Sequence, residues 1–168
     1  PFATSRKTLA EVAAKYWEVC RGTWAPVEAD RVRTMLDLHI LPFFGATRAA
    51  EDKPFTGGKK IGAVKQLHVE EYIAKRQTDG AAPATINKEV ARLRHLFNKA
   101  VAWGEVPRNP CAGIRHLKEP PARVAYLEPH ERALLLTEAA AYSPVLLAII
   151  SVAMLTGARL SEILALTW

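Results

Sequence analysis

The stretch TGARLSEILALTW, residues 156–168, places one arginine among small and apolar residues. Gly157 predicts the end of one helix, and the apolar residues after it predict the start of another. Arg159 would lie at this junction. A guanidinium group stays protonated and donates hydrogen bonds in a planar fork, so the chemistry it offers is anion recognition. The alternative is an ordinary surface cation, and this stretch alone leaves both open.

A second set of chemical groups lies on the helix predicted at residues 83–103. At about 100° per residue, its apolar residues fall within an arc of about 80°, namely Ile86, Val90, Leu93, Phe97 and Ala100. The opposite arc carries only cations and hydrogen-bonding groups, namely Thr85, Lys88, Arg92, His95 and Lys99. Solvated faces usually mix both signs of charge. A purely basic face suits a groove with phosphates on its walls and base edges between them, which favours DNA binding over an ordinary basic surface.

Apolar spacing and helix-stop residues predict an all-α chain. We expect helices at 8–20, 26–40, 69–78, 83–103, 129–141 and 144–155, and another that begins near Arg159. Thr8 and Glu11 form a capping-box pattern, and Pro42 is predicted to stop the second helix. Residues 46–60 are expected to form a loop or a small hairpin. Because the phosphate-loop spacing is missing there, we expect a mobile basic loop that touches the DNA backbone.

Composition excludes several classes of protein. Hydrophobic residues make up 49% and charged residues 24%, as in soluble globular proteins. The longest apolar run, 144–155, is too short to span a bilayer, and no export signal is visible. Cys20 and Cys111 stand far apart without metal-ligand spacing, so we expect reduced thiols in a cytoplasmic protein, with no metal and no cofactor.

The basic charge belongs to one part of the chain. Residues 1–120 hold 20 Lys and Arg against 13 Asp and Glu, whereas residues 121–168 hold 3 against 4. This asymmetry suggests a polyanionic partner for the first segment. Pro120-Pro121 blocks a helix and favours an extended, fairly stiff spacer, so a linker is expected at 118–126.

The sequence resembles the tyrosine recombinases, or phage-type integrases. The segment 82–114, with Arg108-Asn109-Pro110, is similar to the last helices of the family's core-binding domain, and LHILPFFG at 38–45 to the end of an earlier helix. TGARLSEILALTW is similar to the first catalytic motif. The resemblance implies a helical-bundle (SAM-like) core-binding domain at 1–117 and an incomplete N-terminal part of the catalytic domain at 127–168.

The resemblance also implies a chemistry. In this family a tyrosine attacks a DNA phosphate and forms a 3′-phosphotyrosyl intermediate, and fixed arginines stabilise the developing charge. Arg159 matches the first such arginine, and Glu162 matches a position where glutamate is common and could orient it. A helix N-terminus at Arg159 would add N–H donors towards the same anion. The nucleophile and the other catalytic residues are expected beyond Trp168, because Tyr16, Tyr72, Tyr126 and Tyr142 match none of the family's motifs.

These implications give a set of expectations. In a prokaryotic or phage-encoded recombinase that acts as a tetramer, this chain would bind duplex DNA without cutting it. The DNA-binding residues would be Arg31, Arg33, Thr85, Lys88, Arg92, His95 and Lys99, and Arg92→Ala or Lys99→Ala would each reduce the salt dependence of binding. The apolar 144–155 helix predicts self-association. The alternatives are a stand-alone helical DNA-binding regulator and a helical protein-interaction module.

Overall fold

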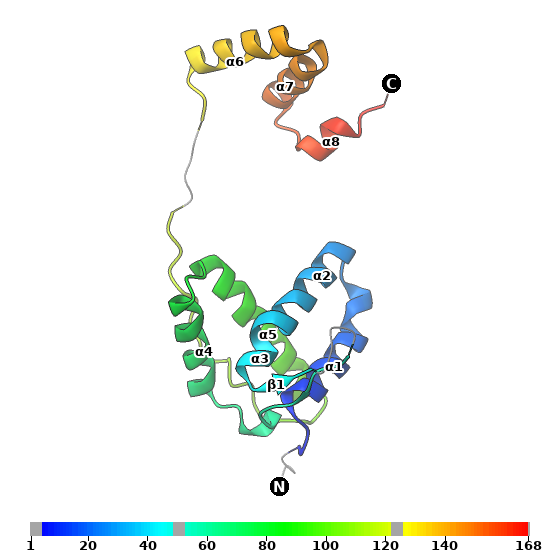
Figure 1. The fold of residues 1–168 in the computed structure, drawn as a ribbon, viewed down its shortest axis with the longest axis vertical. Helices are drawn as coiled ribbons and strands as arrows, with labels where there is room; N and C mark the ends of the chain where they lie inside the picture. Colours follow the sequence, from blue (N-terminus) through cyan, green and yellow to red (C-terminus); the bar gives the residue numbers. More distant parts are fainter. Residues whose placement is uncertain (1–4, 49–52, 122–125, 168) are drawn as a thin grey trace. The chain divides into compact units, whose positions relative to one another are not determined.

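The computed structural model describes residues 5–48, 53–121 and 126–167 and divides into two compact units, Pro1–Pro120 (unit 1) and Pro121–Trp168 (unit 2). Residues 1–4, part of the predicted loop (49–52), four residues of the predicted linker (122–125) and Trp168 lie outside the described residues. Both units are built from helices, with one short hairpin in unit 1 (Figure 1). The predicted all-α class is confirmed.

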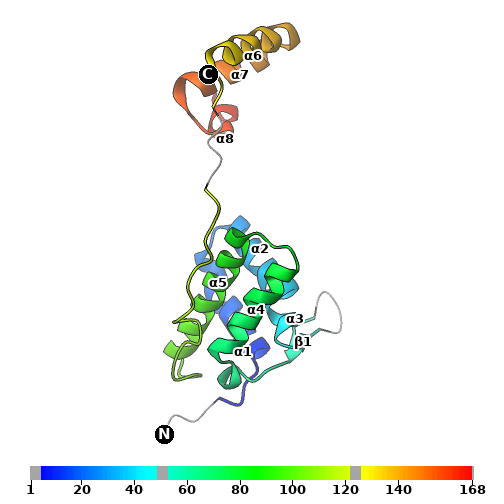
Figure 2. The ribbon, with the colours of Figure 1, turned by 90° about the vertical axis from the view of Figure 1, so that its left-hand side faces the viewer.

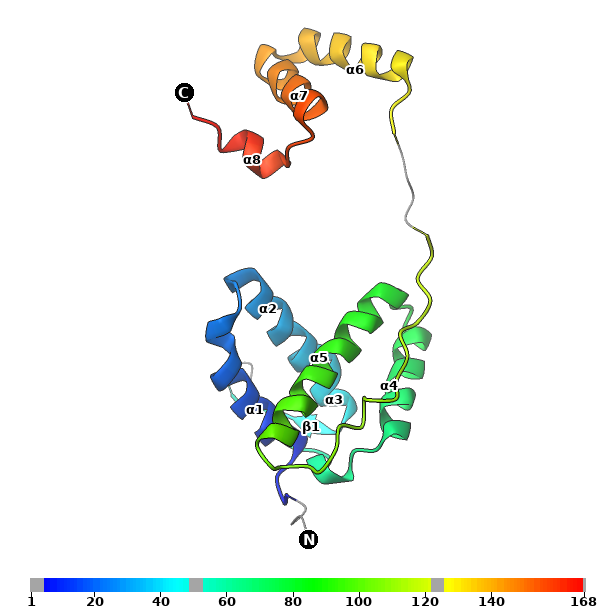
Figure 3. The same cartoon turned by 180° about the vertical axis from the view of Figure 1, so that it is seen from behind.

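Unit 1 is a helical bundle in which α5 lies centrally (Figures 1 and 3). Helices α1, α4 and the segment after α2 pack against α5. The elements are α1 (Leu9–Cys20), η1 (Arg21–Thr23), α2 (Pro26–Thr34), η2 (Met35–Ile40), α3 (Leu41–Phe43), η3 (Ile61–Ala63), α4 (Gln66–Thr78) and α5 (Pro83–Ala102). Thr8 caps α1 in the predicted capping box with Glu11. Gly80 and Gly104 adopt φ of 79° and 73° after α4 and α5, where a left-handed residue ends a helix at little cost.

The predicted apolar face of α5 is the centre of the core. Ile86, Val90, Leu93, Phe97 and Ala100 are all buried, together with side chains from α1 and α4 such as Tyr16 and Tyr72. Each of these residues removes apolar area from water, at about 25 cal/mol per Å². The basic arc of the same helix is thereby turned outwards.

The second helix differs from its prediction, because Pro42 does not stop it. The chain stays helical through η2 and α3, and the Leu41 N–H donates to the Leu36 carbonyl, five residues back. Proline lacks an N–H and its ring crowds the carbonyl four residues earlier. The wider π-type turn of η2 lies directly before Pro42, where it changes the bonding register. The prediction for α4 was also short: it begins at Gln66, and His68 Nδ1 accepts from the Lys65 N–H at 2.9 Å.

The 46–60 stretch forms a hairpin next to α3 (Figure 2). Its strands β1 (Ala46–Thr47) and β2 (Thr56–Gly57) pair in antiparallel register. Gly58 has φ of 80°, and a Cβ there would stand 2.8 Å from the Ala46 nitrogen, so only glycine fits. The Leu9 N–H donates to the Lys59 carbonyl at 3.0 Å. The base of the hairpin is thus anchored to the start of α1. The expected small hairpin is present, and the mobility of the loop and its contact with DNA stay predictions.

Residues 109–119, here called the strap, turn back along α5 (Figure 3). The Arg94 guanidinium donates to the carbonyls of Cys111 at 3.2 Å and Ile114 at 2.6 Å. The side-chain amide of Asn87 pairs with both backbone groups of Leu117, at 3.0 and 2.8 Å. Asn109 donates to the Arg94 carbonyl at 2.9 Å and accepts from the Cys111 N–H at 2.7 Å. Side chains of α5 therefore supply partners that an extended strand would otherwise find in a sheet.

Unit 2 contains α6 (Pro129–Tyr142), α7 (Pro144–Thr156) and α8 (Leu160–Leu164), close to the predicted bounds. The Ser143 hydroxyl accepts from the Val145 N–H at 3.2 Å, and Gly157 adopts φ of 66° after α7, as predicted. Among the described residues of this unit, only Ala139 and Ile163 are buried. The apolar helix α7 has no buried residue at all.

Candidate nucleic-acid interface

The predicted basic arc of α5 lies at the surface of unit 1. Thr85 and Lys88 are exposed, and Arg92, His95 and Lys99 are partly buried. Together with the exposed Arg31 of α2, these residues supply cations and hydrogen-bonding groups, which are suited to phosphates and base edges.

The cations of this surface fall into two kinds. Within the part of the chain that the structure describes, the side chains of Arg31, Lys88 and Lys99 make no hydrogen bond or ion pair. Their charges are therefore available to an external anion. Arg33 and Arg92, by contrast, are already engaged inside the fold.

Arg92 is held by two groups from outside α5. Its guanidinium stands 5.0 Å from the ring centre of Trp24 and forms an ion pair with Glu28 of α2. A planar guanidinium fixed in this way loses little freedom on binding, but Glu28 already neutralises part of its charge. Arg92 is thus oriented more firmly, and is less free electrostatically, than the lysines beside it.

Arg33 lies at one end of a series of contacting side chains that begins at Arg92 and continues through Trp24 and Trp17. The Trp24 and Trp17 rings lie 6.1 Å apart, and the Arg33 guanidinium stands 5.3 Å from the Trp17 ring centre. Its Nε donates to Asp37 at 2.7 Å. On α2, Arg31 shares the side of Glu28 by its three-residue spacing, whereas Arg33 points towards α1. Helical spacing therefore puts Arg31 on the side of α2 that contacts α5 through Glu28.

His95 is the titratable residue of the basic arc whose pKa the fold lowers. Its Nδ1 lies 2.8 Å from the hydroxyl of the buried Tyr16. Partial burial lowers the pKa of His95, and the nearby charges of Arg92 and Lys99 lower it further. At neutral pH this imidazole offers hydrogen bonds rather than charge.

Sequence reasoning missed the partners of this surface. Glu28 and Arg92 are 64 residues apart, and nothing local in either segment signals their pairing. Trp17, Trp24 and Trp103 contact the core, while Trp168 lies outside the described residues. The cation stacked on each of these three rings was not foreseen.

In unit 2 the two residues predicted to be catalytic are paired with each other. The Arg159 guanidinium donates to Glu162 at 2.9 Å, and the Arg159 N–H donates to the same carboxylate at 3.0 Å. These two bonds, the backbone one first, lower the pKa of Glu162. Arg159 precedes α8 as predicted and its side chain is 84% exposed. Because Glu162 occupies the Arg159 N–H, that donor is not free for an anion.

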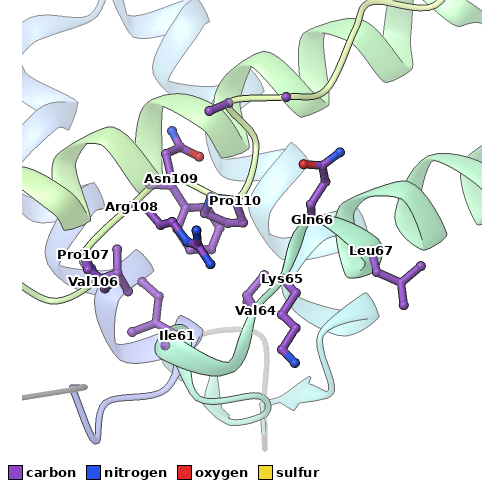
Figure 4. Close-up of a pocket in the computed structure, with 14 residues that line it drawn as sticks. Ile61, Val64, Lys65, Gln66, Leu67, Val106, Pro107, Arg108, Asn109 and Pro110 are labelled. Atoms are coloured by element: carbon purple, nitrogen blue, oxygen red, sulfur yellow. The ribbon is translucent and has the colours of Figure 1, made fainter.

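A hollow on unit 1 lies between the start of α4 and the residues after α5 (Figure 4). Its volume is about 690 Å³, its walls include Ile61, Val64 and Phe97, and it carries the cations Lys65 and Arg108. Its described lining contains no carboxylate, thiol, hydroxyl or imidazole side chain.

Among the described residues there is neither a metal-binding cluster nor a helix that could span a membrane. The described residues contain no cluster of three or more His, Cys, Asp or Glu side chains that could hold a metal ion. None of the described helices is both long and apolar enough to span a bilayer. Cys20 and Cys111 are both buried free thiols, and burial raises the pKa of Cys111 to about 12.

Known structures share this architecture, although no protein-family model and no curated protein matches the sequence. A lambda integrase dimer bound to a COC′ core site matches 98% of the chain at 18% identity and a TM-score of 0.72. The Tn1549 transposon integrase, in complex with a circular intermediate DNA, matches 95% at 19% identity and a TM-score of 0.68. An integrase-like domain from Bacillus cereus matches 76% at 20% identity and a TM-score of 0.57.

The share of this chain that is matched differs from the share of each matched protein. The chain spans 43% of the lambda integrase chain and 48% of the Tn1549 integrase chain, but 96% of the Bacillus cereus domain. Both units are needed to account for coverage of nearly the whole chain. The chain has a fold of the tyrosine recombinase, or phage integrase, type.

Proposed function

We propose that this chain is the DNA-binding part of a tyrosine recombinase that breaks and rejoins DNA through a phosphotyrosyl intermediate. Unit 1 is the core-binding domain and grips duplex DNA with the outer face of α5. The predicted boundaries, a domain at 1–117, a linker at 118–126 and the start of a catalytic domain from 127, are part of this proposal.

One observation carries the proposal. The outer face of α5 presents Lys88 and Lys99 without partners, next to the equally free Arg31 of α2, within the described part of a basic unit. Unpaired cations at helical spacing are suited to phosphates along a groove, and each released counterion adds to the affinity. The DNA-bound integrases that share this fold support the same reading.

In unit 2, we assign to Arg159 the binding of the reacting phosphate and to Glu162 the orientation of Arg159. The pair of bonds from Glu162 to the backbone and the guanidinium of Arg159 supports this division of roles. The four tyrosines match none of the recombinase motifs, so these 168 residues would bind DNA and leave it uncut. The nucleophile and further protomers would come from the rest of a recombinase assembly.

The test is the dependence of duplex affinity on salt concentration. A steep decrease in affinity with salt is expected for the unaltered chain, and Lys88→Ala or Lys99→Ala should each lower the slope by about one unit. Arg92→Ala should lower it by less, because Glu28 already compensates part of that charge.

The matched control is Lys75→Ala, which removes an equal charge on α4 where Asp79 already pairs with it. Its slope should match that of the unaltered chain. A flat salt response of the unaltered chain, or equal effects of Lys75→Ala and Lys88→Ala, would refute DNA binding by this face.

A further inference from the structure

The tautomer of His95 follows from the hydrogen bonds of Tyr16. The Tyr16 ring is fully buried between α1 and α5, and its hydroxyl lies 2.8 Å from His95 Nδ1. Among the described residues, Nδ1 is the one hydrogen-bond partner of this hydroxyl. A hydroxyl buried away from water needs an acceptor for its proton, so the Tyr16 hydroxyl donates to Nδ1. A neutral His95 must therefore carry its own proton on Nε2.

The charge state agrees with this arrangement. An imidazolium would carry a second proton, on Nδ1, and would take away the acceptor of the Tyr16 hydroxyl. It would also add a charge beside Arg92 and Lys99; burial, together with these neighbours, keeps the pKa of His95 low. Burial raises the pKa of Tyr16, so its hydroxyl keeps its proton. The hydrogen bond between Tyr16 and His95 thus runs from the hydroxyl to the imidazole.

The Nε2 end of the ring is open. Its N–H has no hydrogen-bond partner within the described residues. Every buried side-chain nitrogen and oxygen among those residues does have a partner. Nε2 must therefore reach the surface, on the face that also carries Lys88 and Lys99.

We propose that His95 is a base-reading residue, whose fixed Nε2–H donates to an acceptor in the major groove, with Tyr16 as its positioning residue. Guanine is the expected base because its N7 and O6 acceptors lie side by side there, whereas cytosine presents a donor. A neutral donor adds sequence preference without adding salt dependence, unlike the lysines around it. The proposal rests on DNA binding by α5.

The tautomer can be measured without DNA. Nitrogen-15 spectra of the histidine side chains, recorded on the full chain at pH 7.5, should show His95 protonated on Nε2 and accepting on Nδ1. Tyr16→Phe keeps the ring and removes only the hydroxyl, so the Nδ1 signal should lose its hydrogen-bond shift. A proton on Nδ1 in the unaltered chain would overturn the proposal.

The reading function is tested by selecting duplexes from a randomised pool. His95→Ala should weaken a guanine preference at one position by roughly two- to tenfold, the range expected for one hydrogen bond, and leave the salt slope unchanged. His95→Gln should shift the preference at that position towards adenine, the base that a glutamine amide pairs with. Tyr16→Phe should weaken the same preference less than His95→Ala does.

Lys88→Ala is the matched control, since it should lower the salt slope and leave the selected sequence unchanged. Selection of the same sequences by His95→Ala, or a salt slope that falls as in Lys88→Ala, would overturn base reading and leave DNA binding in place. If the unaltered chain shows no salt-dependent binding, the proposed function fails and this inference fails with it.

Discussion

At the scale of single residues, Glu89 joins α4 to α5 through a buried carboxylate. It is 1% exposed, receives two hydrogen bonds from the Arg76 guanidinium at 2.7 and 2.9 Å, and accepts a third from Tyr72 at 2.7 Å. Burial, followed by the bond to Glu89, raises the pKa of Tyr72. Three donors converge on this buried carboxylate, so the cluster tolerates the loss of a partner poorly.

Arg76→Met is expected to lower the free energy of unfolding by about 3–5 kcal/mol, because it leaves the carboxylate buried and unpaired. Urea denaturation measures this. Lys75→Met, one residue away and exposed, is the control and should change stability by less than about 0.5 kcal/mol. Adding Glu89→Leu and Tyr72→Phe to Arg76→Met removes the whole polar cluster and should recover most of the loss. Equal effects of Arg76→Met and Lys75→Met would contradict the assignment.

His95 makes the stability of unit 1 depend on pH near neutrality. Its pKa in the folded chain lies below the ordinary value of 6.5, so the unfolded chain binds the proton first as pH falls. The stabilisation of the folded chain by the neutral imidazole is therefore complete above about pH 6.5 and decreases as pH falls towards the pKa of His95 in the folded chain. The groups that face the imidazole are Arg92 and Lys99 of α5 and Tyr16 of α1.

Between pH 7.5 and 5.0, the urea midpoint should therefore fall more in the unaltered chain than in His95→Gln. The glutamates with lowered pKa, Glu11, Glu105 and Glu162, start from 4.5 and titrate below this window. Identical pH profiles for the two proteins would show that the imidazole is not held neutral by the fold.

How far the residue types alone predict the site depends on how local each signal is. The basic arc of α5 follows from helical spacing, whereas the pairing of Glu162 with Arg159 follows from the resemblance to the tyrosine recombinases; the structure contains both. The partners Glu28, Trp24 and Tyr16 come from other helices and become neighbours only through packing. Glu89 is an acidic residue of the same helix, and its burial depends on Arg76 of α4.

At the scale of elements, the strap depends on α5 side chains rather than on its own sequence. Asn87 is 7% exposed. Its side-chain amide bonds the carbonyl and the N–H of Leu117, as a neighbouring strand would in a sheet. Asn87→Leu keeps a similar volume, but it leaves the two backbone groups of Leu117 without their partner, which costs about 1–3 kcal/mol for each buried group.

Hydrogen exchange of the Leu117 amide reports this directly and should become much faster in Asn87→Leu. Asn98→Ala is the control, because Asn98 only accepts one bond from the Asn109 side chain and its loss leaves the Leu117 pair intact. An unchanged Leu117 amide in Asn87→Leu would mean that other contacts hold the strap.

Element boundaries were predictable where a single residue decides them. Gly80, Gly104 and Gly157 end their helices as expected, since each adopts a positive φ. Pro42 was misread because its local effect is overridden: Ile40 and Leu41, at the end of the π-type turn, are buried in the core, and that burial keeps the chain helical. Packing of this kind is not visible in a short stretch of sequence.

At the scale of the whole molecule, unit 2 leaves a large apolar surface exposed. Leu155 is 87% and Val145 68% exposed on α7, and Leu160, Leu164 and Leu166 follow at 62% each. Isolated apolar residues on a surface are common, but a contiguous set marks a contact with another protein.

Self-association through this surface is expected to increase the mass measured by light scattering as the concentration rises. Val145→Lys combined with Leu155→Lys should restore a monomer. Leu67→Lys, at an exposed leucine on α4 of unit 1, should leave the association unchanged. A strict monomer of the unaltered chain at high concentration would contradict the expectation.

The amide pair between Asn87 and Leu117 also sets the length of the tether to unit 2. The last residue bonded to α5 is Glu119, through Asn87 at 2.7 Å, and the helices of unit 2 start after Glu128. Nine peptide steps extend to at most about 30 Å. If unit 1 binds DNA as proposed, a tether of this length would keep unit 2 at a local concentration of about a millimolar, so Arg159 would need only weak intrinsic affinity for a phosphate. Releasing Asn87 would move the start of the tether back to Ile114 and dilute unit 2 at its target.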